Sequence, residues 1–433
     1  MIGLGERWGW LILLAAAPFL LFPTTWLSPI LLAVPLSLRA LRRSSSLRTA
    51  LDLPVLLIAL MVLVSLYATY NVAVSLPKIA GVMLGIAAYY VCAQLAAKAE
   101  YWWWALAGFF GVGLGVAAVG LLATRWAQKF GALQPWMASF PSAGVINPNE
   151  VAGALLWVIP PLLTTALFLL RKARALRNEL GTSNWVILCA VVVSANMLAF
   201  ITFTLTQSRS AYAGLALTLP VLAIWVLPTR LRRFVGVAVV LLIVAGAGGL
   251  WAAGPETVAQ QIGLRHEVQG RAEIWERGIW ALQDFAFTGM GMNTFRYVVP
   301  VLYPFLEADA NRDIGHAHNE FLQAGLDLGV PGMVAFAALY MGAFWMLLQI
   351  GRVRPTELNR FRNGAFDPTY FTLGLGGGLL AHLFYGLTDA VALGAKPGLL
   401  FWMLLGLIAG LDKLCRRETL GDESDLLAKA VSI

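Results

Sequence analysis

The segment Gly315-His316-Ala317-His318-Asn319-Glu320 concentrates side chains capable of proton chemistry in a largely apolar chain. The sequence has four histidines, and two of them stand one residue apart here. A neutral imidazole can accept a proton near neutral pH, so His318 is the candidate general base. Asn319 could orient a substrate or the imidazole. The alternative is a histidine held where a loop meets a helix, since Asn319 and Glu320 also fit a helix start. His266 and His382 are expected to be structural.

Three arginines are candidates for binding an anionic substrate. Arg209, in Thr206-Gln207-Ser208-Arg209-Ser210, has no acidic neighbour in sequence, and an arginine near hydrocarbon is costly without an anionic partner. The planar guanidinium group of Arg209 can make two parallel hydrogen bonds to a phosphate. The alternative is that the side chain extends to the membrane surface. Arg271 begins an amphipathic stretch, and a helix N-terminus there would favour anions. The alternative for Arg271 is an ion pair with Glu267 or Glu273. Arg265 is a weaker third candidate.

Metal and cofactor sites are not predicted. The three cysteines lie within or beside apolar runs, so neither a disulfide framework nor a cysteine metal site is expected. Asp309-x-Asn311-x-Asp313 followed by Glu320 has the spacing of a calcium loop, but Ile314 stands where the turn glycine is required. Metal-dependent lipid-linked glycosyltransferases commonly use paired carboxylates near the outer surface of an early span, and this sequence has none there. These observations disfavour a metal-dependent mechanism, and no cofactor is expected.

The composition identifies the elements that must position these residues as membrane helices. Of the 433 residues, 59% are hydrophobic and 12% are charged, whereas soluble domains carry about 25% charged residues. Apolar runs of roughly 20 residues recur along the chain, without the alternation of a barrel. We therefore predict an all-α integral membrane protein with about twelve transmembrane helices. The net charge of +8 reflects topology, not nucleic-acid binding.

The charges between the spans predict the orientation in the membrane. Most of the basic residues fall in alternate connections, and the positive-inside rule makes that side cytoplasmic, with both termini inside. The predicted spans are 8–22, 26–41, 53–70, 77–96, 102–123, 151–170, 184–205, 211–227, 234–253, 328–350, 370–391 and 397–411.

One long outer connection, about 254–327, divides the spans into an N-terminal part (1–253) and a C-terminal part (328–433). It holds three of the four histidines, and long structured loops often carry sites. Within it, Arg271–Phe285 has the pattern of a short amphipathic helix at the membrane interface, where tryptophan is favoured.

The motifs of the C-terminal half resemble the O-antigen ligase family over about 190–345. They are, in order, Ser208-Arg209, Gly270-Arg271-x-x-Ile274-Trp275, Gly289-x-Gly291-x-x-x-Phe295, His318-Asn319-x-x-Leu322-Gln323 and Gly325-Leu326-x-x-Gly329-x-x-Gly332. The family includes O-antigen polymerases and protein O-oligosaccharyltransferases.

The resemblance implies transfer of O-antigen from undecaprenyl pyrophosphate to a sugar hydroxyl of lipid A–core, at the periplasmic face of a bacterial inner membrane. The family's essential histidine carries over onto His318, with His316 as the alternative, and its arginines onto Arg209 and Arg271. A metal-independent single displacement that inverts the anomeric carbon is expected, with membrane lipids as surroundings and no nucleic acid as partner.

Three other functions stay open from the sequence. A polymerase would use a second O-antigen unit as acceptor, and a protein-glycosylating relative would use a protein. The moderate outer loop and the lack of an additional soluble domain favour the ligase. A secondary transporter would also have about twelve spans, but should show repeat symmetry and ionisable residues at mid-membrane.

Overall fold

The computed structural model describes residues 49–123, 147–227, 229–254, 265–306, 314–352 and 366–431, together with Thr257 and Gln260. The predicted spans 8–22 and 26–41 lie outside these residues, as do Asp309, Asn311 and Asp313. Every regular element within the described ranges is a helix, and none is a strand. The predicted all-α membrane fold is confirmed.

Each of the ten predicted spans in the described part of the chain coincides with a helix. Six helical segments there are long and apolar enough to cross a membrane, and α3 and part of α11 are shorter apolar helices. The total of twelve spans stays a prediction. The ten helices are α3 (Asp52–Ala68), α4 (Val72–Ala96), α5 (Ala99–Ala123), α8 (Pro148–Arg171), α10 (Thr182–Thr206), α11 (Arg209–Val226), α12 (Thr229–Ala253), α16 (Glu320–Arg352), α17 (Pro368–Gly386) and α18 (Leu399–Val431).

Glycines allow the bundle helices to approach one another closely, as membrane helices require. A Cβ atom on Gly406 of α18 would lie 2.6 Å from the Tyr89 carbonyl oxygen of α4. On α17, a Cβ at Gly378 would lie 2.8 Å from the Trp157 carbonyl oxygen of α8. The first contact holds α18 against α4, and the second holds α17, with the turn that follows it, against α8.

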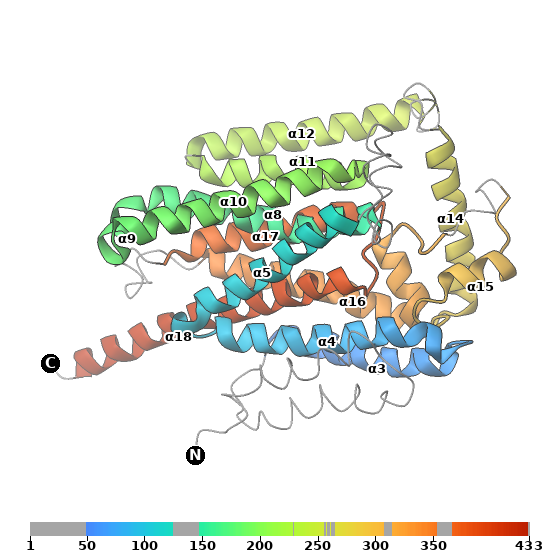
Figure 1. Ribbon diagram of the computed structural model, residues 1–433, viewed down its shortest axis with the longest axis horizontal. Helices are drawn as coiled ribbons and strands as arrows, with labels where there is room; N and C mark the ends of the chain where they lie inside the picture. Colours follow the sequence, from blue (N-terminus) through green and yellow to red (C-terminus); the bar gives the residue numbers. More distant parts are fainter. Residues whose placement is uncertain are drawn as a thin grey trace, which may run out of the picture.

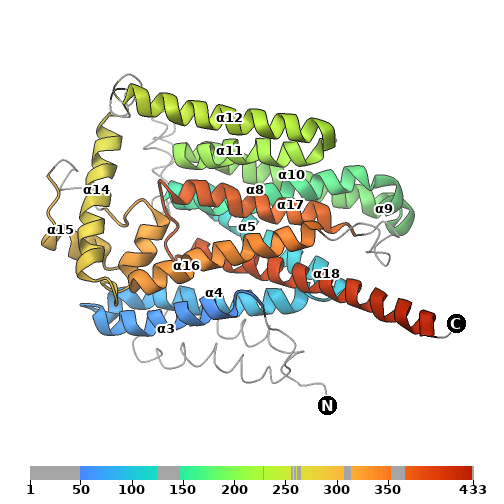
Figure 2. The same ribbon diagram turned by 180° about the vertical axis from the view of Figure 1, so that it is seen from behind.

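The two ends of the bundle differ in the residues they carry (Figures 1 and 2). Basic connections gather at one end, where Arg171 leads into the short helix α9 (Ala173–Leu180) and where α16 ends at Arg352. At the other end lie the start of α11, the start of α16 and the turn after α17. This arrangement agrees with the predicted alternation of charge, and the cytoplasmic assignment of the basic end stays a prediction.

Helix α14 (Arg265–Asp284) crosses this second end at a steep angle to the bundle helices, with α15 (Phe295–Leu302) beside it (Figure 1). Its apolar face packs on the first turns of α16, so that a Cβ atom at Gly278 would lie 3.0 Å from the Leu322 side chain. The predicted start of this helix at Arg271 was wrong, because it begins six residues earlier. Arg271 is therefore inside the helix and not at its N-terminus.

Helix α16 is interrupted at Gly329, where the backbone takes φ 72° and ψ 176°. A side chain at this position would collide with the Phe287 carbonyl oxygen in the loop between α14 and α15. A left-handed conformation and a close backbone approach both require glycine. The break separates a short first segment, which follows the histidines, from the long apolar segment that was predicted as the span 328–350.

Candidate active site

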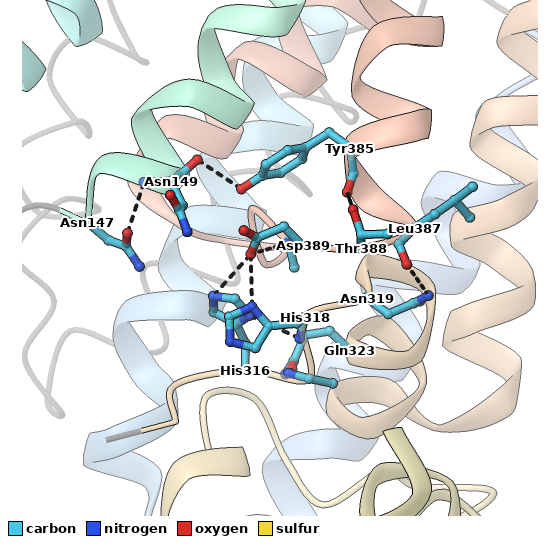
Figure 3. A network of polar contacts seen from close by, with 12 residues as sticks. Asn147, Asn149, His316, His318, Asn319, Gln323, Tyr385, Leu387, Thr388 and Asp389 are labelled. Carbon is cyan, nitrogen blue, oxygen red and sulfur yellow. Dashed lines mark hydrogen bonds and ion pairs between the residues drawn. The ribbon is translucent and has the colours of Figure 1, made fainter. Parts of the chain in front are cut away.

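His318 and Asp389 form a hydrogen-bonded pair at the end of the bundle crossed by α14. The Nδ1 atom of His318 lies 3.1 Å from Oδ1 of Asp389, across 71 positions of sequence (Figure 3). His318 stands two residues before α16, and Asp389 stands three residues after α17. The carboxylate side chain is 1% exposed, whereas the imidazole is 25% exposed. The pair therefore has a buried acidic side and an accessible imidazole side.

The hydrogen bond fixes which nitrogen of His318 can act as a base. An ionised carboxylate only accepts hydrogen bonds, so Nδ1 of the neutral ring carries the proton and donates it to Asp389. The lone pair is then on Nε2, as in the histidine of a catalytic triad. Burial acts to raise the pKa of Asp389, but the His318 hydrogen bond and the neighbouring imidazoles bring it below its usual value. The carboxylate therefore stays charged and orients the ring.

His316 approaches the same carboxylate from a second direction. Its Nε2 atom lies 3.9 Å from Asp389 Oδ1, while its Nδ1 atom accepts the backbone N–H of His318 at 3.2 Å. The ring proton of neutral His316 is therefore on Nε2, facing the carboxylate. Burial lowers its pKa to about 4, with the positive charges of Lys78 and Arg296 acting in the same direction. This arrangement favours His318 over His316 as the base.

His316, His318 and Asp389 also place three possible metal-ligand atoms within 4.8 Å of one another. A histidine that binds a metal through one nitrogen usually donates the N–H of the other. In His316 the nitrogen away from Asp389 accepts a backbone N–H. A metal bound to Nε2 would move the ring proton to Nδ1, and this N–H would then face the backbone N–H of His318 with no acceptor between them. The observed hydrogen bonds fit a carboxylate flanked by two imidazole N–H groups better than a metal site.

The loop that carries the histidines is held by a buried side-chain network. The backbone N–H of Ala317 donates to Gln323 Oε1 at 2.8 Å, and Gln323 Nε2 donates to Asp327 Oδ1 at 2.9 Å. Asp327 also accepts the backbone N–H of Asn293 at 3.3 Å. His318 itself has φ +49°, a left-handed conformation that is uncommon outside glycine. The network supplies the contacts that such a strained residue requires.

Asn319 caps the first turn of α16. Its Oδ1 accepts the N–H of Leu322 at 2.9 Å, and its Nδ2 donates to the Leu387 carbonyl oxygen at 3.1 Å. The capping pattern seen in the sequence is confirmed, and the second bond joins α16 to the turn that carries Asp389 (Figure 3). A substrate contact of Asn319 stays a prediction.

The predicted arginines lie at the same end of the bundle. Arg209 is exposed and begins α11, directly after Gln207, which has φ +50°. Arg271 is half-buried on α14. Glu273, one predicted partner of Arg271, lies 3.7 Å from Arg277. The side chain of Arg265 is outside the part of the structure that is described.

Asp389 is the functional candidate that the sequence did not single out. The predicted span 370–391 placed it inside a helix. The helix instead ends at Gly386, and Asp389 lies in the turn beyond it. The one available signal was a carboxylate within an apolar C-terminal segment.

Comparison with known families adds a match to part of the chain. Residues 194–337 match the family model described as O-antigen ligase. The matched segment contains His318, Arg209 and Arg271, whereas Asp389 lies beyond its end. No curated protein matches the chain.

Proposed function

Because the chain carries the O-antigen ligase family domain at residues 194–337, we propose that it transfers O-antigen from undecaprenyl pyrophosphate to lipid A–core. At the coarser level, the family identifies a membrane glycosyl-transfer enzyme that acts with lipid-linked partners. The observation that carries the finer proposal is the His318–Asp389 pair, whose histidine lies within the matched segment. It provides an oriented base with an accessible second nitrogen.

The proposed reaction is a single displacement. His318 Nε2 removes the proton of an acceptor sugar hydroxyl while the hydroxyl oxygen bonds to the anomeric carbon of the glycan. The bond from that carbon to the pyrophosphate oxygen breaks, and undecaprenyl pyrophosphate leaves with the bonding electrons. Attack opposite to the leaving group inverts the anomeric carbon. Asp389 stabilises the imidazolium that forms, as a carboxylate does in a catalytic triad.

The arginines stabilise the leaving group in this proposal. Charge develops on the pyrophosphate as the glycosidic bond breaks, and fixed cationic donors can stabilise it without a metal ion. Arg209 and Arg271 are the candidates, because both lie at the end of the bundle that holds the histidine. Arginine stays charged and can bind phosphate through two N–H groups. Arg265 and His316 are secondary candidates for the same ligand.

The end of the bundle that carries the site faces the periplasm in this proposal, and both termini are cytoplasmic. The supporting observation is that basic connections such as Arg171 and Arg352 lie at the opposite end. A bacterial inner membrane is the location at which the proposed lipid-linked donor would be used.

A transfer assay with two acceptors tests the proposed function. Purified protein would receive undecaprenyl-pyrophosphate-linked O-antigen with lipid A–core, and separately with the lipid-linked glycan alone. The proposal expects O-antigen on lipid A–core. Glycan that lengthens on its carrier while lipid A–core stays unmodified would identify a polymerase. Transfer to an added protein acceptor would identify an oligosaccharyltransferase, and solute exchange by reconstituted protein without any glycan product would indicate a transporter.

A further inference from the structure

Glu320 and His382 form a second acid–histidine pair, inside the bundle and close to the first. Glu320 Oε2 lies 3.2 Å from His382 Nδ1, and the two side chains are 4% and 0% exposed. Glu320 is the first residue of α16, and His382 lies in the last turns of α17. Neither side chain has the solvent access that contact with a sugar would need.

The neighbours of this pair come from three helices. The Tyr340 hydroxyl of α16 lies 3.0 Å from His382 Nδ1, and the His382 ring stacks on Trp157 of α8 with ring centroids 3.8 Å apart. Gly386 leaves room for the carboxylate, since a Cβ atom there would lie 2.6 Å from Glu320 Oε2. The start of α16 is therefore held in a site built by α8 and α17.

A buried ionisable pair is a poor source of stability. Burial of ionisable groups costs free energy whether they stay charged or become neutral, and apolar replacements are often as stable or more stable. An ionisable residue inside a membrane bundle therefore points to function. Because the pair itself is closed to substrate, any role in function must be indirect and must act through a neighbouring site.

The neighbouring site is the His318–Asp389 pair. Glu320 is two residues after His318, and His382 is seven residues before Asp389. In sequence, Asn319 and Leu387 lie between the members of the two pairs, and their 3.1 Å hydrogen bond joins the two segments. A slip of α16 along α17 would separate His318 from Asp389, and a misplacement of about 1 Å can lower a rate about 100-fold.

We propose that Glu320 and His382 are positioning residues that hold the first turn of α16 against α17 and thereby keep His318 hydrogen-bonded to Asp389. This inference rests on the proposed function only in assigning catalysis to the His318–Asp389 pair. If the two residues served packing alone, their replacement would lower the stability of the protein by the same amount whether or not Asp389 is present.

A double-mutant cycle between Glu320 and Asp389 separates the two roles. Contacting or coupled residues are non-additive, whereas independent residues add. Glu320→Ala is expected to lower the turnover rate for glycan transfer about 10- to 100-fold, with little change in the acceptor KM. In an Asp389→Asn background the same change should cost less than about 3-fold, because the bond it protects is already disrupted. Glu320→Gln, which keeps the shape and a hydrogen-bonding oxygen, should retain more activity than Glu320→Ala.

Chemical modification of His318 gives a readout that needs no substrate. Peptide mass spectrometry would measure the rate at which diethyl pyrocarbonate modifies His318. This rate in Glu320→Ala should equal the rate in Asp389→Asn and differ from that of the wild type. Thr202→Ala is the matched control, because it removes a buried 3.2 Å hydrogen bond between α10 and the Ala117 carbonyl of α5. It should leave both the modification rate and the turnover rate at wild-type values.

The outcomes distinguish this proposal from the proposed function. Full, multiplicative losses in the double variant together with wild-type modification of His318 would overturn the positioning role and leave the ligase proposal standing. Transfer to a different acceptor would change the proposed function, and the cycle would still be read with that acceptor. If Glu320→Ala does not fold, the apolar replacement Glu320→Met, which keeps the side-chain volume but breaks the pair, supplies the same comparison in both backgrounds. A His318 modification rate unchanged from wild type in that variant would count against the proposal.

Discussion

The Nδ1 atom of His318 and the Oδ1 atom of Asp389 lie 3.1 Å apart and join the start of α16 to the turn after α17. The carboxylate also accepts the backbone N–H of Ala390 at 3.0 Å, so its own orientation is fixed. The His318 ring is consequently held in one tautomer, with Nε2 free to accept a proton. This relationship turns a single histidine motif into an oriented acid–histidine pair.

Asp389→Asn should lower the turnover rate of glycan transfer about 100- to 10,000-fold with little change in substrate KM. An amide in place of the carboxylate no longer enforces the Nδ1–H tautomer or stabilises the imidazolium. Steady-state kinetics of the purified variant provide the measurement. Asp412→Asn is the control, because Asp412 pairs with Arg416 at 2.9 Å on α18 and not with the histidines. Equal turnover rates in Asp389→Asn and Asp412→Asn would show that the His318–Asp389 pair has no part in the mechanism.

The stability of the protein should depend on His316 in mildly acidic solution. Burial lowers its pKa from 6.5 to about 4, so between these values the unfolded chain binds a proton that the folded protein does not. The free energy of unfolding therefore contains the full contribution of neutral His316 above pH 6.5. As the pH falls toward 4, this contribution, up to about 3 kcal/mol, is lost.

His316→Gln is the variant that isolates this effect, because an amide N–H can replace the Nε2 donor without titrating. Melting temperatures of wild type and variant would be measured from pH 7 to pH 4. The wild type should lose stability relative to the variant over this window. Curves that stay parallel would show that His316 is not buried in its neutral form.

The sequence predicted most of the helices because a bilayer imposes length and composition on every span. It failed where the boundary depended on tertiary contacts. Leu387, Ala390 and Val391 continue the hydrophobic composition of the predicted span 370–391 past Gly386, so hydropathy does not mark the end of α17. In α14, four of the five residues from Arg265 to Gln269 are polar, so the amphipathic pattern does not extend to the first turns, although the helix is continuous through them.

The site was predicted in part for the same reason. His318 and Arg209 stood out because polar residues are rare in this chain and their motifs resemble a family. Asp389 is 71 residues from His318, and only the packing of α16 on α17 brings the two together. Asn319 illustrates the other limit, since its capping bond to Leu322 was readable from local pattern, but its bond to Leu387 was not.

Chelation should leave glycan transfer unchanged. The Nδ1 atom of His316 accepts a backbone N–H, an arrangement that opposes metal binding through Nε2. Activity would be measured after dialysis against EDTA, and again after addition of Zn²⁺ or Mg²⁺ in excess of the chelator. Activity lost to EDTA and restored by either ion would replace the proposed mechanism with a metal-dependent one.

Arg271→Ala and Arg209→Ala should each lower kcat/KM for the pyrophosphate donor about 100- to 1,000-fold, the cost of removing one donor that stabilises developing charge. Lysine at either position should recover only part of the loss, because it lacks the planar fork. Arg277→Ala on the same helix is the control, since Arg277 pairs with Glu273 and stacks 4.3 Å from the Trp280 ring. Equal losses in all three alanine variants would point to a general charge effect.

Transfer in a single turnover by His318→Ala tests the central claim most directly. Enzyme in excess over lipid-linked O-antigen, with lipid A–core present, would be sampled over time for wild type, His318→Ala and His316→Ala. Removal of the base predicts a chemical step slowed about 100- to 10,000-fold in His318→Ala, with donor still bound, and a smaller loss in His316→Ala. A His318→Ala protein that transfers glycan at the wild-type rate would contradict the account.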